Sequence, residues 1–265
     1  MGEAVLMEQE QAVVESRGFS LSWGAASDKG RVRDENQDTF LVESELGLFL
    51  VSDGMGGHRG GALASQIVAQ DLPVMIETRL HKLRSYSRRA IRLLFRRMIT
   101  EQSRQLQMEG VSESGYKGMG ATLVMALIKD GRAYLGSVGD SRLYRFRKGS
   151  LVQLTKEHSV VSELLSAGKI EPRDIQNHPA QGQLTHYIGM EDRLEPFVRS
   201  FALKDGDRLV LCTDGLTDMV DDKSIARILD DNNDAKSACD ALLKSANQAG
   251  GLDNITVIVV DVRER

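Results

Sequence analysis

The chain has 265 residues, of which 41% are hydrophobic and 27% charged, and its formal net charge is −4. This length and composition suit one globular domain, and no Pro-rich or Gly/Ser-rich linker divides the chain. The negative charge argues against general nucleic-acid binding, although it is compatible with a local basic patch. Two isolated cysteines, Cys212 and Cys239, favour buried thiols in a reducing cytosol over a disulfide scaffold.

No apolar run reaches the ~18 residues that a transmembrane helix needs. Residues 1–6 contain an early acid and no basic segment, so they do not resemble a secretory signal. We therefore predict a cytoplasmic protein without membrane insertion, and we expect a monomer.

The first half of the chain is predicted to contain an N-terminal extension followed by strands and a helical region. Residues 1–18 are polar and rich in Glu and Gln, and are predicted to be an N-terminal extension or frayed helix ahead of a single domain at 19–265. Apolar residues alternate with serines from residue 19, which is typical of a half-buried strand. Strands are also predicted at 39–42 and 46–51. Residues 61–110 are helical by composition, with apolar residues at spacings that fit one helix face.

The second half begins as a meander, with strands predicted at 121–128, 133–138, 142–147 and 151–154. Residues 156–190 show little regular pattern beyond a helix at 159–167, and a long polar insertion of this kind often forms a flap beside a functional site. Strands at 197–203 and 208–212, helices at 224–229 and 235–249, and a strand at 255–260 complete the chain. This order favours an α+β fold of mostly antiparallel sheets flanked by helices over repeated βαβ units.

A basic stretch lies within the predicted helices. Between Arg79 and Arg104 there are nine Lys or Arg residues and one Glu, which gives a local charge of 9 − 1 = +8. The stretch could form a surface for acidic partners or membrane phosphates. A solvated helix face is the favoured interpretation.

Four aspartates share one context. Asp53 and Asp214 each end an apolar run and precede a glycine, Asp253 precedes an apolar run, and Asp140 lies in a turn between two strands. An Asp-Gly pair alone is commonly only a turn. Recurrence at strand ends indicates carboxylates whose mutual repulsion is offset by a divalent cation. Gly54, which has no Cβ, can turn its backbone carbonyl towards the same point.

Oxygen ligands without paired Cys or His favour magnesium or manganese over zinc. Two such ions a few Å apart can share a water and make it a nucleophile near neutral pH. Arg33, beside the acidic stretch 34–38, suits a phosphate oxygen because guanidinium binds phosphate bidentately. The residue types indicate metal-assisted phosphate hydrolysis, but their convergence in space does not follow from sequence alone.

Six segments, taken in order, resemble the motifs of the metal-dependent type 2C (PPM) serine/threonine protein phosphatases, most closely the bacterial branch. They are GRVRDENQD at 30–38, VSDGMGGH at 51–58, GMGAT at 118–122, VGDSR at 138–142, TDGLTD at 213–218 and GLDNIT at 251–256. The resemblance spans residues 20–262. One motif alone would be weak, whereas six in the right order are specific.

The resemblance implies a four-layer α-β-β-α sandwich with a centre for two Mn or Mg ions at one end. It assigns Asp53, Asp214 and Asp253 to the metals, with the Gly54 carbonyl as a further ligand. Three further residues complete the implied site. Asp38 would bind a metal through coordinated water, and Asp140 would serve a third, weaker ion with Asp214. Arg33 would hold the substrate phosphate. The implied catalytic residues are Arg33, Asp53, Asp214 and Asp253. A water bridging the two metals would attack phosphorus in line, without a phosphoenzyme.

Several residues depart from the family pattern or support it. Gln37 stands where many members have Glu, which implies weaker or water-mediated coordination without loss of activity. Met55 stands where animal members carry a histidine proposed as general acid, and His58 is the nearest substitute, although a structural role for it is equally open. The flap segment 178–182 lacks the Arg-Asn often found there. Gly120 and Thr122 are expected only to support the neighbouring loop.

The function that follows is hydrolysis of phosphoserine and phosphothreonine on proteins, opposing a bacterial Ser/Thr kinase. Phosphoprotein substrates and a cognate kinase are the expected partners, and nucleic acid is not. Two alternatives stay open: a non-catalytic module that binds a phosphorylated or acidic partner, and a small-molecule phosphohydrolase with the same metal chemistry.

Overall fold

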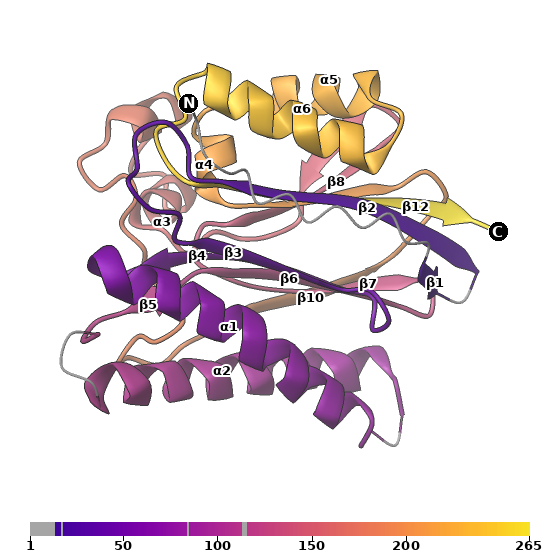
Figure 1. Ribbon diagram of the computed structural model, residues 1–265, viewed down its shortest axis with the longest axis horizontal. Coiled ribbons are helices and arrows are strands. Elements are labelled where there is room, and N and C mark those ends of the chain that lie inside the picture. Colours follow the sequence, from indigo (N-terminus) through magenta and orange to yellow (C-terminus); the bar gives the residue numbers. More distant parts are fainter. Residues whose placement is uncertain (1–13, 17, 84, 113–115) are drawn as a thin grey trace.

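A computed structural model describes residues 14–16, 18–83, 85–112 and 116–265, without the side chains of 14–16, 57–59 and 176–177. Two β-sheets pack face to face, and helices cover the outer face of each, so the molecule has four layers in the order α-β-β-α (Figure 1). All strand pairs are antiparallel. The predicted fold class is confirmed.

Each sheet draws its strands from both halves of the chain. In one sheet the order is β1 (Val14–Ser16), β2 (Phe19–Asp28), β12 (Ile255–Glu264), β11 (Arg208–Cys212), β8 (Arg142–Arg147) and β9 (Ser150–Gln153). In the other it is β10 (Phe197–Ala202), β7 (Arg132–Val138), β6 (Leu123–Lys129), β4 (Leu48–Met55) and β3 (Asp38–Glu43), with β5 (Gly120–Ala121) paired to β4. The ends of several strands therefore meet at one edge of the sandwich.

The helices form the two outer layers. Helices α1 (Gly57–Leu80) and α2 (Arg88–Ser112) cover the sheet that contains β4, and α4 (Asp214–Thr217), α5 (Asp222–Asp231) and α6 (Ala235–Gln248) cover the sheet that contains β12 (Figure 1). The predicted helical region at 61–110 is thus two helices. No helix of the described residues is long and apolar enough to cross a membrane.

Strand β4 explains why its sequence is an unbroken apolar run. Leu48 and Leu50 pack towards α1 and α2, whereas Phe49 and Val51 pack between the two sheets. Because neighbouring side chains on a strand point to opposite faces, a strand covered on both sides must be apolar throughout. The Phe49 ring packs against Trp23 of β2 in a T-shaped arrangement, with a centroid distance of 5.9 Å. Packing on both faces therefore holds this strand in place up to Asp53, where its sequence becomes polar.

The sequence predicts two forms for residues 1–18, an extension or a frayed helix. Val14–Ser16 pair with β2 in antiparallel register, Val14 opposite Leu21, so the described part of the extension is an edge strand where the sequence suggested a frayed helix. Residues 1–13 and 17 lie outside the described residues. The domain boundary at residue 19 stays a prediction.

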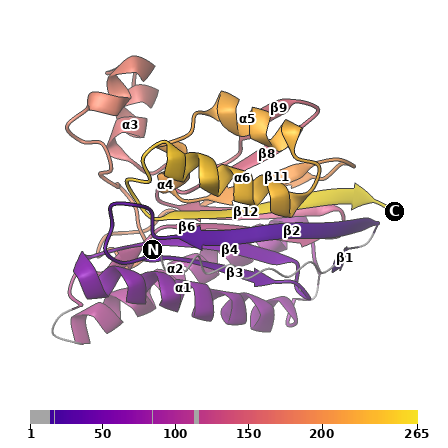
Figure 2. The same ribbon diagram turned by 45° about the horizontal axis from the view of Figure 1, so that its top comes forward.

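The segment predicted as a flap contains α3 (Val160–Ser166) and the 3-10 helix η1 (Pro172–Asn177). It projects from one end of the sandwich (Figure 2). An isolated bridge between Ser159 and Leu184 joins the two ends of this segment to each other, and one between Ala121 and Ile188 fastens its C-terminal end to β5.

Candidate active site

Two predicted metal ligands lie opposite one another on neighbouring strands. Asp38 begins β3 and Asp53 lies near the end of β4, and the antiparallel register pairs them directly. Directly paired carboxylates repel each other. Asp38 is buried, and its Oδ2 accepts a hydrogen bond from the Thr213 hydroxyl at 2.8 Å. Their placement thus concentrates negative charge at this end of the sheet.

The second sheet contributes two more carboxylates. Asp214 follows β11 and begins α4, and Asp253 lies two residues before β12, the strand that pairs with β11. Gly215 packs so closely on the Asn254 carbonyl that a Cβ at position 215 would lie 1.9 Å from that oxygen. The glycine that follows Asp214 is therefore required for α4 to start against the strand end.

Asp140 lies in the connection that crosses from β7 in one sheet to β8 in the other. Gly139 precedes it with a φ of +94°, a conformation that suits glycine. His158 holds this turn with two hydrogen bonds: its N–H donates to the Gly139 carbonyl at 2.8 Å, and its Nδ1 accepts from the Gly139 N–H at 3.2 Å. Thus His158, although outside the cavity, fixes the backbone that carries Asp140.

Arg33 reaches the carboxylates from the loop between β2 and β3. Its Nη2 donates to Asp253 Oδ2 at 2.7 Å. Asn254 holds this loop, because its side-chain amide donates to the carbonyls of Lys29 and Glu35 and its Oδ1 accepts from the Gln37 N–H. One asparagine therefore fastens the Arg33 loop to the strand end that carries Asp253.

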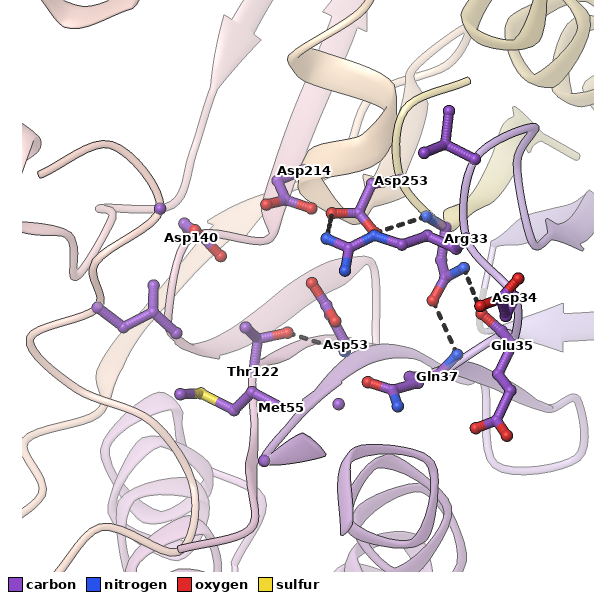
Figure 3. A pocket seen from close by; sticks show the side chains of 16 residues that line it. Arg33, Asp34, Glu35, Gln37, Asp53, Met55, Thr122, Asp140, Asp214 and Asp253 are labelled. Atoms are coloured by element: carbon purple, nitrogen blue, oxygen red, sulfur yellow. Dashed lines mark hydrogen bonds and ion pairs between the residues drawn. The ribbon is translucent and has the colours of Figure 1, made fainter. Parts of the chain in front are cut away.

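These residues line a cavity of about 570 Å³, here called the acidic cavity. Figure 3 shows Asp53, Asp140, Asp214 and Asp253 arranged around one space, with Arg33 extending across it towards Asp253. Asp38 lies beneath the lining, next to Asp53 and Thr213. The cavity is also lined by Gly54, Thr122 and, from the flap, Gly182 and Leu184. The predicted residues are therefore brought together, and the flap borders them.

The electrostatics of the carboxylates follow from burial and crowding. Burial raises the pKa of Asp38 to about 7 and that of Asp140 to about 6. Burial, reinforced by the neighbouring carboxylates, also raises the pKa of Asp53 and of Asp214 well above the ordinary aspartate value. Both effects disfavour the charged form. A cation among these groups would favour it and would lower the same pKa values.

The donor set fits a hard divalent cation. Asp38 Oδ1 and Asp214 Oδ1 are buried and have no hydrogen-bond partner among the described residues. Such unsatisfied carboxylate oxygens are costly, and oxygen donors of this kind are the ligands that magnesium and manganese prefer. As placed, the described residues include no group of three Asp, Glu, His or Cys side chains that could enclose an ion. Both Asp253 oxygens accept hydrogen bonds instead, one from Arg33 and one from the Asn254 N–H.

Gly54 is necessary for a reason that the sequence did not indicate. Besides lining the cavity, it lies against the start of α1, where an added Cβ would be 1.9 Å from the Gly61 carbonyl oxygen. Its N–H donates to the Gln37 carbonyl at 3.1 Å. Gly54 thus permits close contact between strand β4, helix α1 and the loop before β3.

Sequence reasoning missed or undervalued several supporting residues. Thr122 Oγ1 accepts the Asp53 N–H at 2.9 Å and lies 2.7 Å from the Ser141 hydroxyl, so it links the end of β4 to the Asp140 turn. Thr213 both donates to Asp38 and accepts the Thr256 N–H. Thr213 precedes the predicted ligand Asp214 in the TDGLTD motif, and Asn254 follows the predicted ligand Asp253 in the GLDNIT motif. This adjacency was the sequence feature from which a supporting role could have been predicted. The His58 side chain lies outside the described residues.

Comparison with known proteins identifies the family. Residues 29–254 match the family model described as protein phosphatase 2C. The chain belongs to this family, and the family predicted from the sequence motifs is confirmed. The Streptococcus pneumoniae protein phosphatase PhpP is 34% identical over 242 residues, covering 90% of this chain and 96% of that protein. The Listeria monocytogenes serine/threonine phosphatase stp is 34% identical over 238 residues, covering 89% and 93%.

Solved structures agree with the sequence comparison. The serine/threonine phosphatase of S. agalactiae has a TM-score of 0.83 at 33% identity, covering 91% of this chain and 99% of that one. The catalytic domain of the serine/threonine protein phosphatase PstP, solved in complex with two manganese ions, has a TM-score of 0.77 at 30% identity, covering 93% and 100%. The predicted sandwich is therefore shared with solved phosphatases.

Proposed function

We propose that the protein is a manganese- or magnesium-dependent phosphatase that hydrolyses phosphoserine and phosphothreonine on other proteins. The observation that carries this proposal is the convergence of five aspartates from two sheets, two of them with a buried, unpartnered oxygen. The family membership and the printed activities of the relatives support the same chemistry. A bacterial Ser/Thr kinase would be the opposing enzyme.

The carboxylates would hold the metals. Asp53, Asp214 and Asp253 line the cavity and would be the direct ligands, together with the Gly54 carbonyl. Asp38, buried behind Asp53, would act through an intervening water, and Asp140 with Asp214 would serve a third ion. When bound, such ions activate a shared water for in-line attack on phosphorus.

The remaining residues would bind and orient the substrate. Arg33 lies across the cavity and has the charge and fork geometry for a phosphate group. To bind phosphate it would leave Asp253, which frees that carboxylate at the same time. Thr122, Thr213 and Asn254 would keep the ligands in place through the hydrogen bonds described above. Cys212 and Cys239, both buried and free, support a reducing cytosolic location.

The test is a metal-dependent assay on the purified protein. Phosphate release from a phosphothreonine peptide and from p-nitrophenyl phosphate should require added Mn or Mg. Asp53→Asn should lower the rate by about two orders of magnitude or more, because it removes a ligand charge at the reaction centre. Asp230→Asn, an exposed position on α5, is the matched control and should leave the rate unchanged.

Other outcomes would select the alternatives. A substrate panel in which nucleotides or sugar phosphates are hydrolysed much faster than phosphoproteins would favour a small-molecule phosphohydrolase. Phosphopeptide binding that persists in EDTA, with no turnover in excess manganese, would favour a non-catalytic binding module and would overturn the proposal.

A further inference from the structure

Helix α2 carries a stripe of arginines on its solvent side. Arg88, Arg92 and Arg96 follow one another at intervals of four residues, and all three are exposed. Residues four apart on a helix lie on the same face. The buried face of α2 is formed by other residues, among them Ile91, Phe95 and Met98. Of the stripe, Arg92 also links the helix to the sheet, through a long hydrogen bond from its Nη2 to the Val198 carbonyl of β10 at 3.4 Å.

Part of this stripe surrounds a hollow in the surface. Its lining consists of Arg88, Arg89, Arg92, Leu93, Arg96 and Ser200 around a volume of about 540 Å³, and we call it the arginine hollow. No acidic residue lines it. Within the described part of the chain, none of its four arginines forms an ion pair. The hollow is therefore a concave surface with uncompensated positive charge.

The arrangement costs the free protein stability. Like charges four residues apart on a helix repel each other, as Arg88, Arg92 and Arg96 must. Arg88 and Arg89 also occupy the first turn of α2, which contains no acidic residue, and cations there oppose the helix dipole. A bound polyanion would relieve both effects. Local conflicts of this kind are expected chiefly at functional sites.

An apolar residue lies within the basic lining. Leu93 is 66% exposed and lines the hollow together with Arg92 and Arg96. A small inorganic anion would not use this surface. A polypeptide segment with acidic side chains and one apolar side chain would satisfy both the arginines and Leu93.

A second hollow adjoins the arginine hollow on the side of the flap. Arg96 also lines this second hollow of about 610 Å³, which includes Lys156 and His186. Segment 182–197 contributes His186 to that hollow and Leu184 to the acidic cavity. The second hollow is also lined by Glu157, Glu163 and Glu195, so its charge is mixed and the arginine hollow is the part that suits an acidic segment.

We propose that the arginine hollow binds an acidic polypeptide segment with an apolar anchor, which serves as a docking segment of a protein substrate away from its phosphorylated residue. The concave shape and Leu93 favour a peptide over a flat membrane surface. The role in substrate recruitment rests on the proposed phosphatase function, whereas peptide binding itself does not.

The test is fluorescence anisotropy with a labelled, unphosphorylated peptide of Asp and Glu residues around one central Leu, measured in EDTA. The double variant R92E/R96E should bind this peptide about tenfold more weakly than the wild type, because two charge pairs become repulsive. The control K223E/K244E makes the same change in net charge at exposed positions on α5 and α6, in the outer layer opposite α2, and should bind within about twofold of the wild type. L93A should weaken binding without changing its salt dependence.

Three results would overturn the proposal: equal loss of affinity in R92E/R96E and K223E/K244E, equal binding of a neutral peptide, or tighter binding to phosphatidylserine vesicles than to the peptide. Circular dichroism verifies that the variants fold. Hydrolysis of p-nitrophenyl phosphate tests the proposed function separately, since R92E/R96E should retain that activity while its KM for an acidic phosphoprotein rises. Peptide binding without turnover would reject the phosphatase function and leave the binding site standing.

Discussion

Arg33 and Asp253 form an ion pair across the mouth of the acidic cavity, with Arg33 Nη2 and Asp253 Oδ2 2.7 Å apart. Both side chains are partly exposed, at 56% and 37%, so solvent screens the pair and its net contribution to stability is small. One residue proposed to hold phosphate thus neutralises a residue proposed to hold metal. The pair can therefore be exchanged for phosphate and metal at little cost.

Replacement of Arg33 should affect substrate binding more than metal binding. Arg33→Ala should lower kcat/KM for a phosphothreonine peptide by about 10- to 100-fold, because a bidentate, charge-assisted contact with phosphate is lost. Arg33→Lys should recover only part of this loss, since lysine keeps the charge without the fork. Manganese affinity, measured by isothermal titration calorimetry, should not fall in Arg33→Ala. A parallel fall in both quantities would contradict the assignment.

Asp38 and Asp140 should each make the metal-free protein less stable as pH rises, whereas His158, whose pKa burial lowers to about 4, contributes in the opposite sense. Burial raises the folded-state pKa of Asp38 to about 7 and of Asp140 to about 6, whereas an unfolded aspartate titrates near ~3.9. The folded state therefore binds protons more tightly, so this stabilisation is complete below about pH 4 and is lost as pH rises to about 7. Urea unfolding in EDTA across this range measures the effect.

Two controls accompany the pH measurement. Asp38→Asn should flatten the pH dependence, because the amide cannot ionise and still accepts the Thr213 hydrogen bond. Added manganese should reverse the trend, since it binds the ionised carboxylates. Stability that rises with pH in EDTA for the wild type, and not for Asp38→Asn, would show that Asp38 is ionised in the folded protein.

His158 should act through the Gly139 turn. It is 8% exposed, and its backbone N–H and its Nδ1 both form hydrogen bonds with Gly139, while its carbonyl accepts one from the Thr185 N–H. His158→Ala leaves the Gly139 N–H without its acceptor and should destabilise the protein by about 1–3 kcal/mol. His158→Asn places an oxygen near the position of Nδ1 and should recover part of the loss. Thermal unfolding measures the stability, and a larger loss of manganese affinity in His158→Ala than in His158→Asn would support positioning of Asp140.

Gly54 should tolerate no side chain. A Cβ would lie 1.9 Å from the Gly61 carbonyl oxygen, so Gly54→Ala must separate β4 from α1 and should cost about 3 kcal/mol or more. Gly149→Ala is the control, because Gly149 has a φ of +76° with open space around it and should cost only about 1 kcal/mol. Equal stability losses in urea unfolding would show that backbone conformation, and not the contact with Gly61, requires the glycine.

Local patterns predicted most of the elements. The apolar run before Asp53 and the run before Asp214 are strands, and the bounds predicted at 208–212 and 142–147 agree with β11 and β8. Shorter elements left no usable pattern: β1 has three residues and α4 has four. A helix of four residues spans about one turn, which is too short for a hydrophobic period to appear.

Residue patterns alone could not predict that the carboxylates converge in space. Asp38 and Asp53 meet through local pairing of β3 and β4, but Asp214 and Asp253 reach them only because two sheets pack face to face. Such packing depends on contacts between distant parts of the sequence. The family resemblance supplied this arrangement, whereas the roles of Thr213, Asn254 and His158 became visible only in three dimensions.

The division of the ligands between two sheets has a consequence for how the molecule unfolds. Asp38 and Asp53 belong to one layer, and Asp214 and Asp253 to the other. An ion held by both layers acts as a reversible cross-link, because it binds only while the layers face each other. Hydrogen exchange should then slow in both sheets together when manganese is added, so the concentration of the ion would set how cooperatively the two halves of the sandwich open.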